Sequence, residues 1–207
     1  MSFRIYRPQC SKTFSIVLYF RSSLTHGACV KAPECLESPR LIYRRPAAAD
    51  AAEIFARYAA DPRVTRYVGF RAHASIDDTR EFLAWSDAQW AQWPAGPYLV
   101  RVRAGNVLAG STGLAFETPA RAATGYVLAA DAWGQGYATE ALGAMAALAP
   151  ALGVRRLYAL CHVGHEASSR VLEKGGFTRE GILRRYMTFP NLGDGEPADV
   201  FCYSLVF

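Results

Sequence analysis

The chain has 207 residues, of which 51% are apolar, 13% aromatic and 20% charged. This ordinary globular composition excludes collagen, coiled-coil and wholly disordered proteins. The length favours one domain with an appendage and is ample for a self-sufficient core. The longest apolar run without a charge, Phe14–Phe20, is far shorter than the about 20 residues that cross a bilayer, so we expect no membrane association.

The formal net charge of +5 is distributed unevenly along the chain. Residues 1–40 hold 6 basic and 2 acidic side chains, whereas the other residues hold 17 basic and 16 acidic ones. A nucleic-acid-binding surface would need a basic patch or a known motif within the folded part. The near-neutral balance after residue 40 therefore predicts no nucleic-acid partner.

The five cysteines follow no metal-binding pattern. Three of them lie within residues 1–40, Cys161 and Cys202 stand far apart, and the sequence has no CxxC, HExxH or CxxCH spacing. We therefore predict no metal site and a reduced, cytoplasmic location.

Residues 1–38 are predicted to be an extension of unassigned role, either disordered or the product of a misplaced start, and residues 39–207 to be the folded domain. A signal peptide is disfavoured because Arg21 ends an apolar run that is already short.

From Leu41 onward, apolar spacing and turn residues predict a regular series of elements. The first half contains a strand, two helices that begin at Asp50 and at Ser75 or Asp77, and three strands: Leu41–Arg45, 50–58, 75–90, Tyr98–Val102, Val107–Phe116 and Gly125–Leu128. The second half contains helix, strand, helix and two strands: Ala138–Leu152, Leu157–Cys161, Glu166–Lys174, Phe177–Leu183 and Val200–Val206. We expect Pro150 to kink or end its helix. This order indicates a mixed α/β domain.

The stretch Trp133–Ala141 (WGQGYATEA) lies between a predicted strand and a predicted helix. Two glycines, Gly134 and Gly136, permit a tight turn with uncovered backbone N–H groups, and the helix N-terminus adds partial positive charge. The stretch is thus a candidate phosphate site, although turn geometry alone can also require the glycines. The P-loop and dinucleotide-binding fingerprints are absent.

Trp133–Ala141 resembles the acyl-CoA pyrophosphate loop of the GNAT acetyltransferases, in the form typical of their RimJ/RimL-like (ribosomal-protein N-acetyltransferase-like) branch. A second block, Ala167–Phe177 (ASSRVLEKGGF), is similar to that branch's NxASxRVLEKxGF segment. Leu36–Ile42 and Asp199–Leu205 are similar to the family's opening and last strand. The resemblance covers residues 36–207 in the right order.

The resemblance implies the GNAT fold, an α/β architecture with a central mixed, mostly antiparallel sheet, helices on both faces and a splayed central strand pair, here 125–128 and 157–161. It implies acetyl-CoA as co-substrate and no metal. The residues expected to bind acetyl-CoA are the backbone of Tyr126, Val127 and Leu128, the loop residues and three side chains near the next helix: Trp133, Gly134, Gln135, Gly136, Tyr137, Ala138, Thr139, His165, Ser168 and Arg170.

The implied activity is transfer of acetyl from acetyl-CoA to a primary amine by direct attack in a ternary complex. Ser168 is a candidate proton donor to the leaving sulfur, or else a helix cap. Glu117 is a candidate base for the amine, or else a surface carboxylate. Cys161 is expected to pack in the core rather than act as a nucleophile. The alternative function is a catalytically silent CoA-binding sensor or regulatory module.

Two further features of the sequence bear on the substrates: one departure from the family's pattern and two variable segments. His165 stands where the family has Asn, so this position can still form a hydrogen bond but can also titrate. The acceptor is expected to be set by the segments 61–75 and 184–199. Their mixed charges leave open a protein N-terminus or a small molecule as the partner, and a monomer or homodimer as the assembly.

Overall fold

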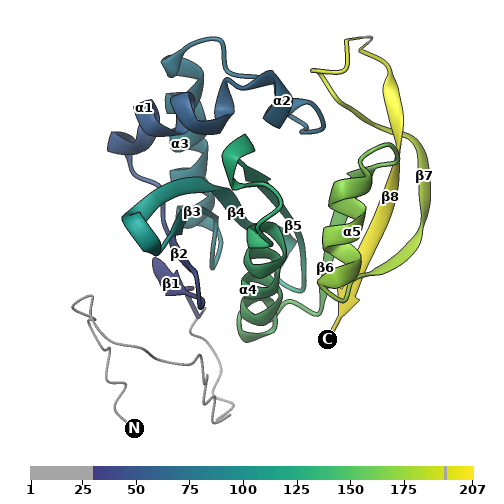
Figure 1. The fold of residues 1–207 in the computed structure, drawn as a ribbon. Coiled ribbons are helices and arrows are strands. Elements are labelled where there is room, and N and C mark those ends of the chain that lie inside the picture. The colour runs from purple at the N-terminus through teal and green to yellow at the C-terminus, as the bar shows by residue number, and fades with distance from the viewer. Residues whose placement is uncertain (1–29, 194) are drawn as a thin grey trace, which may run out of the picture.

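The computed structural model describes residues 30–193 and 195–207. They form an eight-stranded sheet in the order β1-β2-β3-β4-β5-β6-β8-β7 (Figure 1). The strands are β1 Cys35–Glu37, β2 Leu41–Arg44, β3 Pro97–Val102, β4 Val107–Thr118, β5 Arg121–Leu128, β6 Arg156–His162, β7 Thr178–Thr188 and β8 Pro197–Val206. The α-helices are α1 Ala51–Ile54, continued by a π-helical turn Phe55–Ala59, α2 Pro62–Thr65, α3 Ile76–Gln92, α4 Tyr137–Ala151 and α5 Glu166–Lys174.

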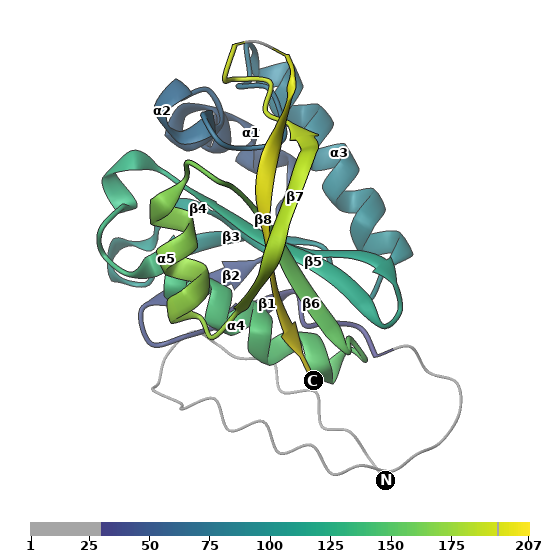
Figure 2. The ribbon, with the colours of Figure 1, turned by 90° about the vertical axis from the view of Figure 1, so that its right-hand side faces the viewer.

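The predicted fold class is confirmed. β5 and β6 pair in parallel, and the other neighbouring strands pair antiparallel. Figure 2 shows α3 on the opposite side of the sheet from α4 and α5. Two buried clusters follow this layering, because alternate residues of β3 face opposite sides. Tyr98 and Val100 pack in the cluster that contains α4, whereas Leu99 packs in the cluster that contains Ile54 of α1.

The central strands β5 and β6 splay apart. They are paired only where Arg121–Ala123 meets Arg156–Tyr158, so the rest of β5 leaves its edge toward β6 without a strand partner. On its other side β5 is paired with β4 along most of its length, from Arg121 to Leu128. At Gly110 a Cβ atom would lie 2.0 Å from the carbonyl oxygen of Val127, so glycine is required where β4 passes this end of β5. The short pairing between β5 and β6 confirms the predicted splay.

Residues 30–38 belong with the domain, which corrects the predicted boundary after residue 38. β1 pairs with β2, and the Lys31 ammonium donates to the carbonyl oxygens of Trp90 and Trp93, at 2.9 Å each. The Tyr98 hydroxyl donates to Pro33 O at 2.7 Å. The pattern missed β1 because it is a three-residue edge strand flanked by Pro33 and Pro39. The rest of the predicted extension, residues 1–29, lies outside the described residues.

The other predicted helices and strands are present, and Ser75 is the N-cap of α3. Two strands are longer than predicted: β5 begins at Arg121 instead of Gly125, and β7 ends at Thr188 instead of Leu183. The short helix α2 was not predicted, although Asp61 caps it and Pro62 occupies its first position. Pro150 lies in the last turn of α4, which ends at Ala151 as expected.

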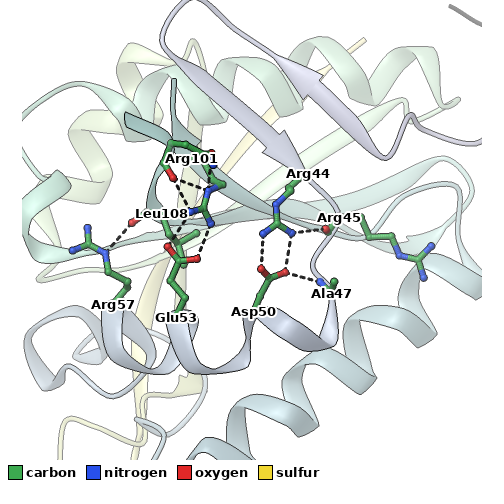
Figure 3. A network of polar contacts seen from close by, with 9 residues as sticks. Arg44, Arg45, Ala47, Asp50, Glu53, Arg57, Arg101 and Leu108 are labelled. Atoms are coloured by element: carbon green, nitrogen blue, oxygen red, sulfur yellow. Dashed lines mark hydrogen bonds and ion pairs between the residues drawn. The ribbon is translucent and has the colours of Figure 1, made fainter. Parts of the chain in front are cut away.

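Ion pairs between arginines of the sheet and carboxylates of the α1 segment hold α1 against the sheet (Figure 3). Arg44 of β2 binds Asp50 through both carboxylate oxygens. Arg101 of β3 binds Glu53 in the same bidentate manner, at 2.8 and 2.9 Å. The Arg57 side chain donates to Leu108 O at 3.0 Å. These contacts position the segment that leads into α2, which borders the pockets described below.

The contribution of the Arg44–Asp50 pair to stability can be tested through its dependence on pH. Burial alone would raise the pKa of its carboxyl, but hydrogen bonds from Arg44 and from the Ala47 N–H outweigh burial and lower the pKa. Such a group stabilises the fold above its unfolded pKa, and this stabilisation disappears as the pH falls through the folded value. We predict that Asp50→Asn costs about 2 kcal/mol near neutral pH. Between about pH 5 and about pH 3, its urea-derived stability should fall less steeply than that of the unmodified chain.

Asp87→Asn is the control, because Asp87 binds Arg45 at 2.9 Å at an exposed position. Equal pH slopes for the unmodified chain and Asp50→Asn would contradict the assignment.

Candidate active site

A pocket of about 630 Å³ lies at the splay between β5 and β6. Its walls come from α2 and the turn after it, the ends of β5 and β6, the loop before α4, and the first turns of α5. Of the residues predicted to bind acetyl-CoA, all but Gln135 line this pocket. The fold therefore brings the two sequence blocks, Trp133–Ala141 and Ala167–Phe177, to one cavity.

The loop before α4 has the backbone geometry that its glycines predict. Gly134 and Gly136 have φ values of +73° and +78°, in the left-handed region that favours glycine. The Trp133 indole donates to Leu128 O at 2.8 Å, which fixes the start of the loop against the end of β5. The Gln135 side chain donates to Asp131 O at 2.8 Å and thus faces away from the pocket.

The N–H groups of residues 134–139 find no acceptor among the residues that the structure describes. A Cβ placed on Gly134 would meet no atom within 4 Å, so open space lies next to this backbone. Unpaired N–H groups at the start of a fifteen-residue helix form an anion site through hydrogen bonds and the helix dipole. The chain's own geometry therefore fits a pyrophosphate here.

Arg40 and Glu140 brace the loop from outside. Arg40 donates to Gln135 O at 2.8 Å, pairs with Glu140 at 2.7 Å and lies over the Tyr137 ring at 4.9 Å. Glu140 also accepts from the Ser38 hydroxyl at 2.6 Å and from the Arg40 backbone N–H at 2.8 Å. Burial opposes ionisation of Glu140, but these hydrogen bonds lower its pKa overall. Glu140 is thus a structural anion, and Arg40 is a positioning residue that the sequence did not reveal.

This brace leads to a prediction about cofactor affinity. Arg40→Met keeps an unbranched stem but removes the bonds to Gln135 O and Glu140, so the loop loses part of its preorganisation. We expect the Kd for acetyl-CoA, measured by calorimetry, to rise about 5-fold. Arg80→Met is the matched control, because Arg80 pairs with Asp77 on the exposed side of α3. A Kd that changes equally in both variants would refute the bracing role.

Ser168 and Tyr126 meet across the splay. The Tyr126 hydroxyl lies 2.9 Å from Ser168 Oγ and 3.2 Å from Ser168 O. Burial raises the pKa of Tyr126, although the bond to Ser168 opposes this, so the phenol stays protonated at neutral pH. The Ser168 side chain makes no capping bond for α5, whose N-cap is His165. The pair therefore places two hydroxyl groups in the pocket.

Cys161 lies beside this pair but is unsuited to attack. Its side chain is 3% exposed, and its Sγ contacts His162 O at 3.5 Å and Ser169 Oγ at 3.6 Å. Burial raises the pKa of the thiol, with hydrogen bonds from Ser168 and Ser169 opposing. A thiol held protonated in this way is a poor nucleophile, which agrees with the predicted packing role.

Two histidines flank Tyr67 at the pocket wall. His165 stacks on the Tyr67 ring at 4.6 Å, and His162 lies 5.0 Å from it. His162 Nδ1 accepts from the Gly164 N–H at 3.0 Å, so the neutral ring carries its proton on Nε2. Burial lowers the pKa of both histidines, and the charge of His162 further lowers that of His165. Both rings are therefore neutral at physiological pH.

Arg170 lies at the pocket, whereas Glu117 lies away from it. Arg170 lines the pocket, with an exposed side chain that pairs with Glu166 at 3.3 Å. Glu117, at the end of β4, pairs with Arg121 at 2.6 Å and accepts from the Tyr158 hydroxyl. It is not among the residues that line this pocket or the neighbouring one. The structure thus gathers the CoA-loop residues, Ser168 and Arg170, but not Glu117.

A second pocket, of about 900 Å³, adjoins the first. Residues 124–127 of β5, Tyr67, Val68 and Leu160 line both of them. The segments expected to set the acceptor line this second pocket, through residues 67–74 and through Met187 and Phe189. A ligand in the first pocket and a ligand in the second pocket would therefore be in contact at the free edge of β5.

Within residues 30–193 and 195–207, no cluster of three or more His, Cys, Asp or Glu side chains could hold a metal ion. In the same part of the chain, no helix has the length and apolar character to cross a membrane.

Comparisons with known proteins identify the family of the chain. The family described as "Acetyltransferase (GNAT) domain" matches residues 40–178, more than half of the chain. The chain therefore belongs to the GNAT family of acetyltransferases, and the predicted family is confirmed. It is an N-acetyltransferase that uses acetyl-CoA as co-substrate.

The chain is 33% identical over 174 residues to the uncharacterized N-acetyltransferase YoaA of Bacillus subtilis, covering 83% of this chain and 96% of that protein. Its fold is similar to that of the microcin C7 self-immunity acetyltransferase MccE, solved with acetyl-CoA and AMP (TM-score 0.75, 20% identity, 86% and 99% of the two chains). It is also similar to RimL, the ribosomal L7/L12 α-N-protein acetyltransferase, solved with coenzyme A (TM-score 0.73, 22% identity, 84% and 98%). At these identities the likeness shows the fold.

Proposed function

We propose that the enzyme transfers acetyl to a primary amine by direct attack within a ternary complex of both substrates. The observation that carries the proposal is the junction of two pockets along residues 124–127 of β5. A thioester in the first pocket and an amine in the second can thus be in contact without an acetylated enzyme residue. The high pKa and burial of Cys161 favour the same conclusion.

The chain's own groups would hold acetyl-CoA, whose thioester supplies the acetyl group. The free N–H groups of residues 134–139 bind the pyrophosphate, and the unpaired edge of Tyr126–Leu128 binds the pantetheine arm as an added strand. His165, with no ring hydrogen bond among the described residues, lies on the same wall and serves as a further polar contact. Arg170 provides positive charge near the mouth.

In the proposed reaction, Ser168 donates a proton to the departing CoA sulfur and regains one from the attacking nitrogen, so the proton that nitrogen loses ends on sulfur. The Tyr126 phenol stabilises the Ser168 oxygen during this exchange through their shared hydrogen bond. The neighbouring Tyr126 also holds the Ser168 hydroxyl in place. We leave Glu117 out of the proton transfer, because its carboxylate is engaged by Arg121 and Tyr158 outside both pockets.

The proposed location is the cytoplasm, where acetyl-CoA is available and where the buried thiol of Cys161 stays reduced. No observation favours a catalytically silent CoA-binding module.

The proposal is tested by measuring thiol release from acetyl-CoA with a panel of amines, followed by mass spectrometry of the products. We expect thiol release that depends on an amine and yields its N-acetyl derivative. An enzyme that accumulates acetyl on a cysteine or serine before the amine is added would contradict direct attack.

A further inference from the structure

The second pocket, on the side of β5 where the acceptor must lie, has aromatic walls. Seven aromatic side chains from five parts of the chain line it: Tyr58, Tyr67, Phe70, Phe82, Trp85, Tyr126 and Phe189. Trp85 is 48% exposed and Phe70 39% exposed, so part of each side chain remains accessible to a ligand. Exposed aromatic faces around a cavity favour a planar apolar ligand, which gains stacking and burial together.

The mouth of this pocket is held in shape from outside. The Asn191 side chain accepts from the Ala72 N–H at 2.9 Å and donates to Thr65 O and Phe70 O, at 2.7 Å each. These bonds join the β7–β8 connection to the segment after α2. A Cβ on Gly69 would lie 2.3 Å from the Met187 side chain, so the two segments are in close contact. The pocket is therefore preformed.

The charges at this pocket favour a cation. Glu81 lies one helical turn before Trp85 on α3, is exposed, and has no ion pair within the described part of the chain. Asp78 also lines the pocket but is engaged by the N–H groups of Ala74 and Ser75, at 2.7 and 3.0 Å. Arg71 also lines the pocket and carries the opposite charge. Burial lowers the pKa of His73, although the charge of Asp78 acts to raise it, so the His73 ring is neutral. The two carboxylates outweigh the one arginine.

The same walls are poorly suited to a peptide. Each residue of a protein N-terminus brings a backbone N–H and C=O that need partners when buried. The backbone of β4 and β5 behind the pocket is already paired strand to strand, from Gly110–Leu128 to Phe116–Ala122. Once acetyl-CoA occupies the free edge of β5, an extended peptide would find few free backbone partners here, whereas a small amine carries one polar group.

We propose that the acceptor is a small arylalkylamine, a primary amine joined to an aromatic ring by a short alkyl chain. This assignment rests on the proposed function, because it names the amine of that same reaction. The ring lies among the aromatic walls with Trp85 as its main stacking partner, and Glu81 attracts the protonated amine to the mouth. The amine then loses this proton to solvent water at the mouth, and the neutral nitrogen faces the thioester at the free edge of β5.

The test compares tryptamine and 2-phenylethylamine with n-butylamine and with a short peptide that has a free N-terminal serine. Thiol release with the full chain should give the aromatic amines a kcat/KM at least about 10-fold above the other two. A peptide or aliphatic amine that matches them would overturn the assignment. Calorimetry of tryptamine with the CoA-saturated enzyme tests the class without turnover, and absence of binding at millimolar concentration would also overturn it.

Two variants test which residues determine the preference for aromatic amines. Trp85→Ala should raise the KM for tryptamine about 5-fold and leave the KM for acetyl-CoA unchanged. Val107→Ala is its control, because Val107 is 46% exposed and lines neither pocket. Glu81→Gln should lower kcat/KM about 3-fold at low salt and less at high salt. Asp77→Asn on the same helix is its control. Tryptamine kinetics that respond equally to test and control variants would refute these roles.

Failure of this assignment can be distinguished from failure of the proposed function. If acetyl-CoA binds and another amine is acetylated, only the arylalkylamine class is wrong. If no amine is acetylated, the proposed function fails, and the calorimetric result still decides whether the second pocket accepts an aromatic amine.

Discussion

Gly136→Val is expected to weaken acetyl-CoA binding about 100-fold or more. Gly136 has a φ of +78°, a conformation that a β-branched residue adopts only with strain. Its new Cβ would also lie 3.3 Å from Arg40 Nη2, the group that braces the loop. Both effects displace the N–H groups that face the pyrophosphate. The measurement is calorimetric titration with acetyl-CoA.

Gly105→Val is the matched control. Gly105 has a φ of +80°, so valine meets the same backbone strain, but it lies in the turn between β3 and β4 and lines neither pocket. We expect both variants to lose similar unfolding free energy, about 1–3 kcal/mol, and only Gly136→Val to lose acetyl-CoA affinity. An affinity for Gly136→Val within about 3-fold of the unmodified chain would refute the placement of the pyrophosphate.

Ser168→Ala is expected to lower kcat about 100-fold, because it removes the proposed proton donor to the sulfur. The KM for acetyl-CoA should change little, since backbone N–H groups carry most of its binding. Tyr126→Phe should have a smaller effect of about 10-fold, because Ser168 remains but loses its 2.9 Å partner. Steady-state kinetics with a fixed amine provide both values.

Ser169→Ala is the control for this pair. Ser169 is the next residue on α5, and its hydroxyl contacts Cys161 Sγ at 3.6 Å. It should therefore tolerate the same change with nearly normal turnover. If Ser168→Ala retains kcat, or if Ser169→Ala loses as much, the proton-donor role is wrong.

The parts of the site that the sequence predicted are those encoded locally. Gly134 and Gly136 have positive φ because a tight turn before a helix needs it, and this requirement is visible in the spacing alone. α5 has the predicted bounds, Glu166–Lys174, since its apolar face and the following glycines are contiguous in sequence. The splay came from the resemblance and not from periodicity.

The parts that the sequence did not predict depend on contacts between distant segments. Arg40 reaches Glu140 across 100 positions in the chain, and a lone arginine before a strand gives no sign of such a partner. The Tyr126–Ser168 pair spans 42 positions, so Tyr126 could not be distinguished from a core aromatic residue. Glu117 was a reasonable candidate at a strand end, but its pairing with Arg121, four residues away, occupies it. The aromatic walls of the second pocket likewise assemble only in the fold.

We propose that acetyl-CoA lies at the splay, with its pyrophosphate on the free backbone N–H groups before α4. An NMR titration of ¹⁵N-labelled protein with acetyl-CoA observes those groups directly. We expect the largest amide shifts at residues 134–139, with further shifts at Tyr126–Leu128. Unchanged amides at residues 134–139, with the shifts confined to another surface such as the β7–β8 hairpin, would contradict it.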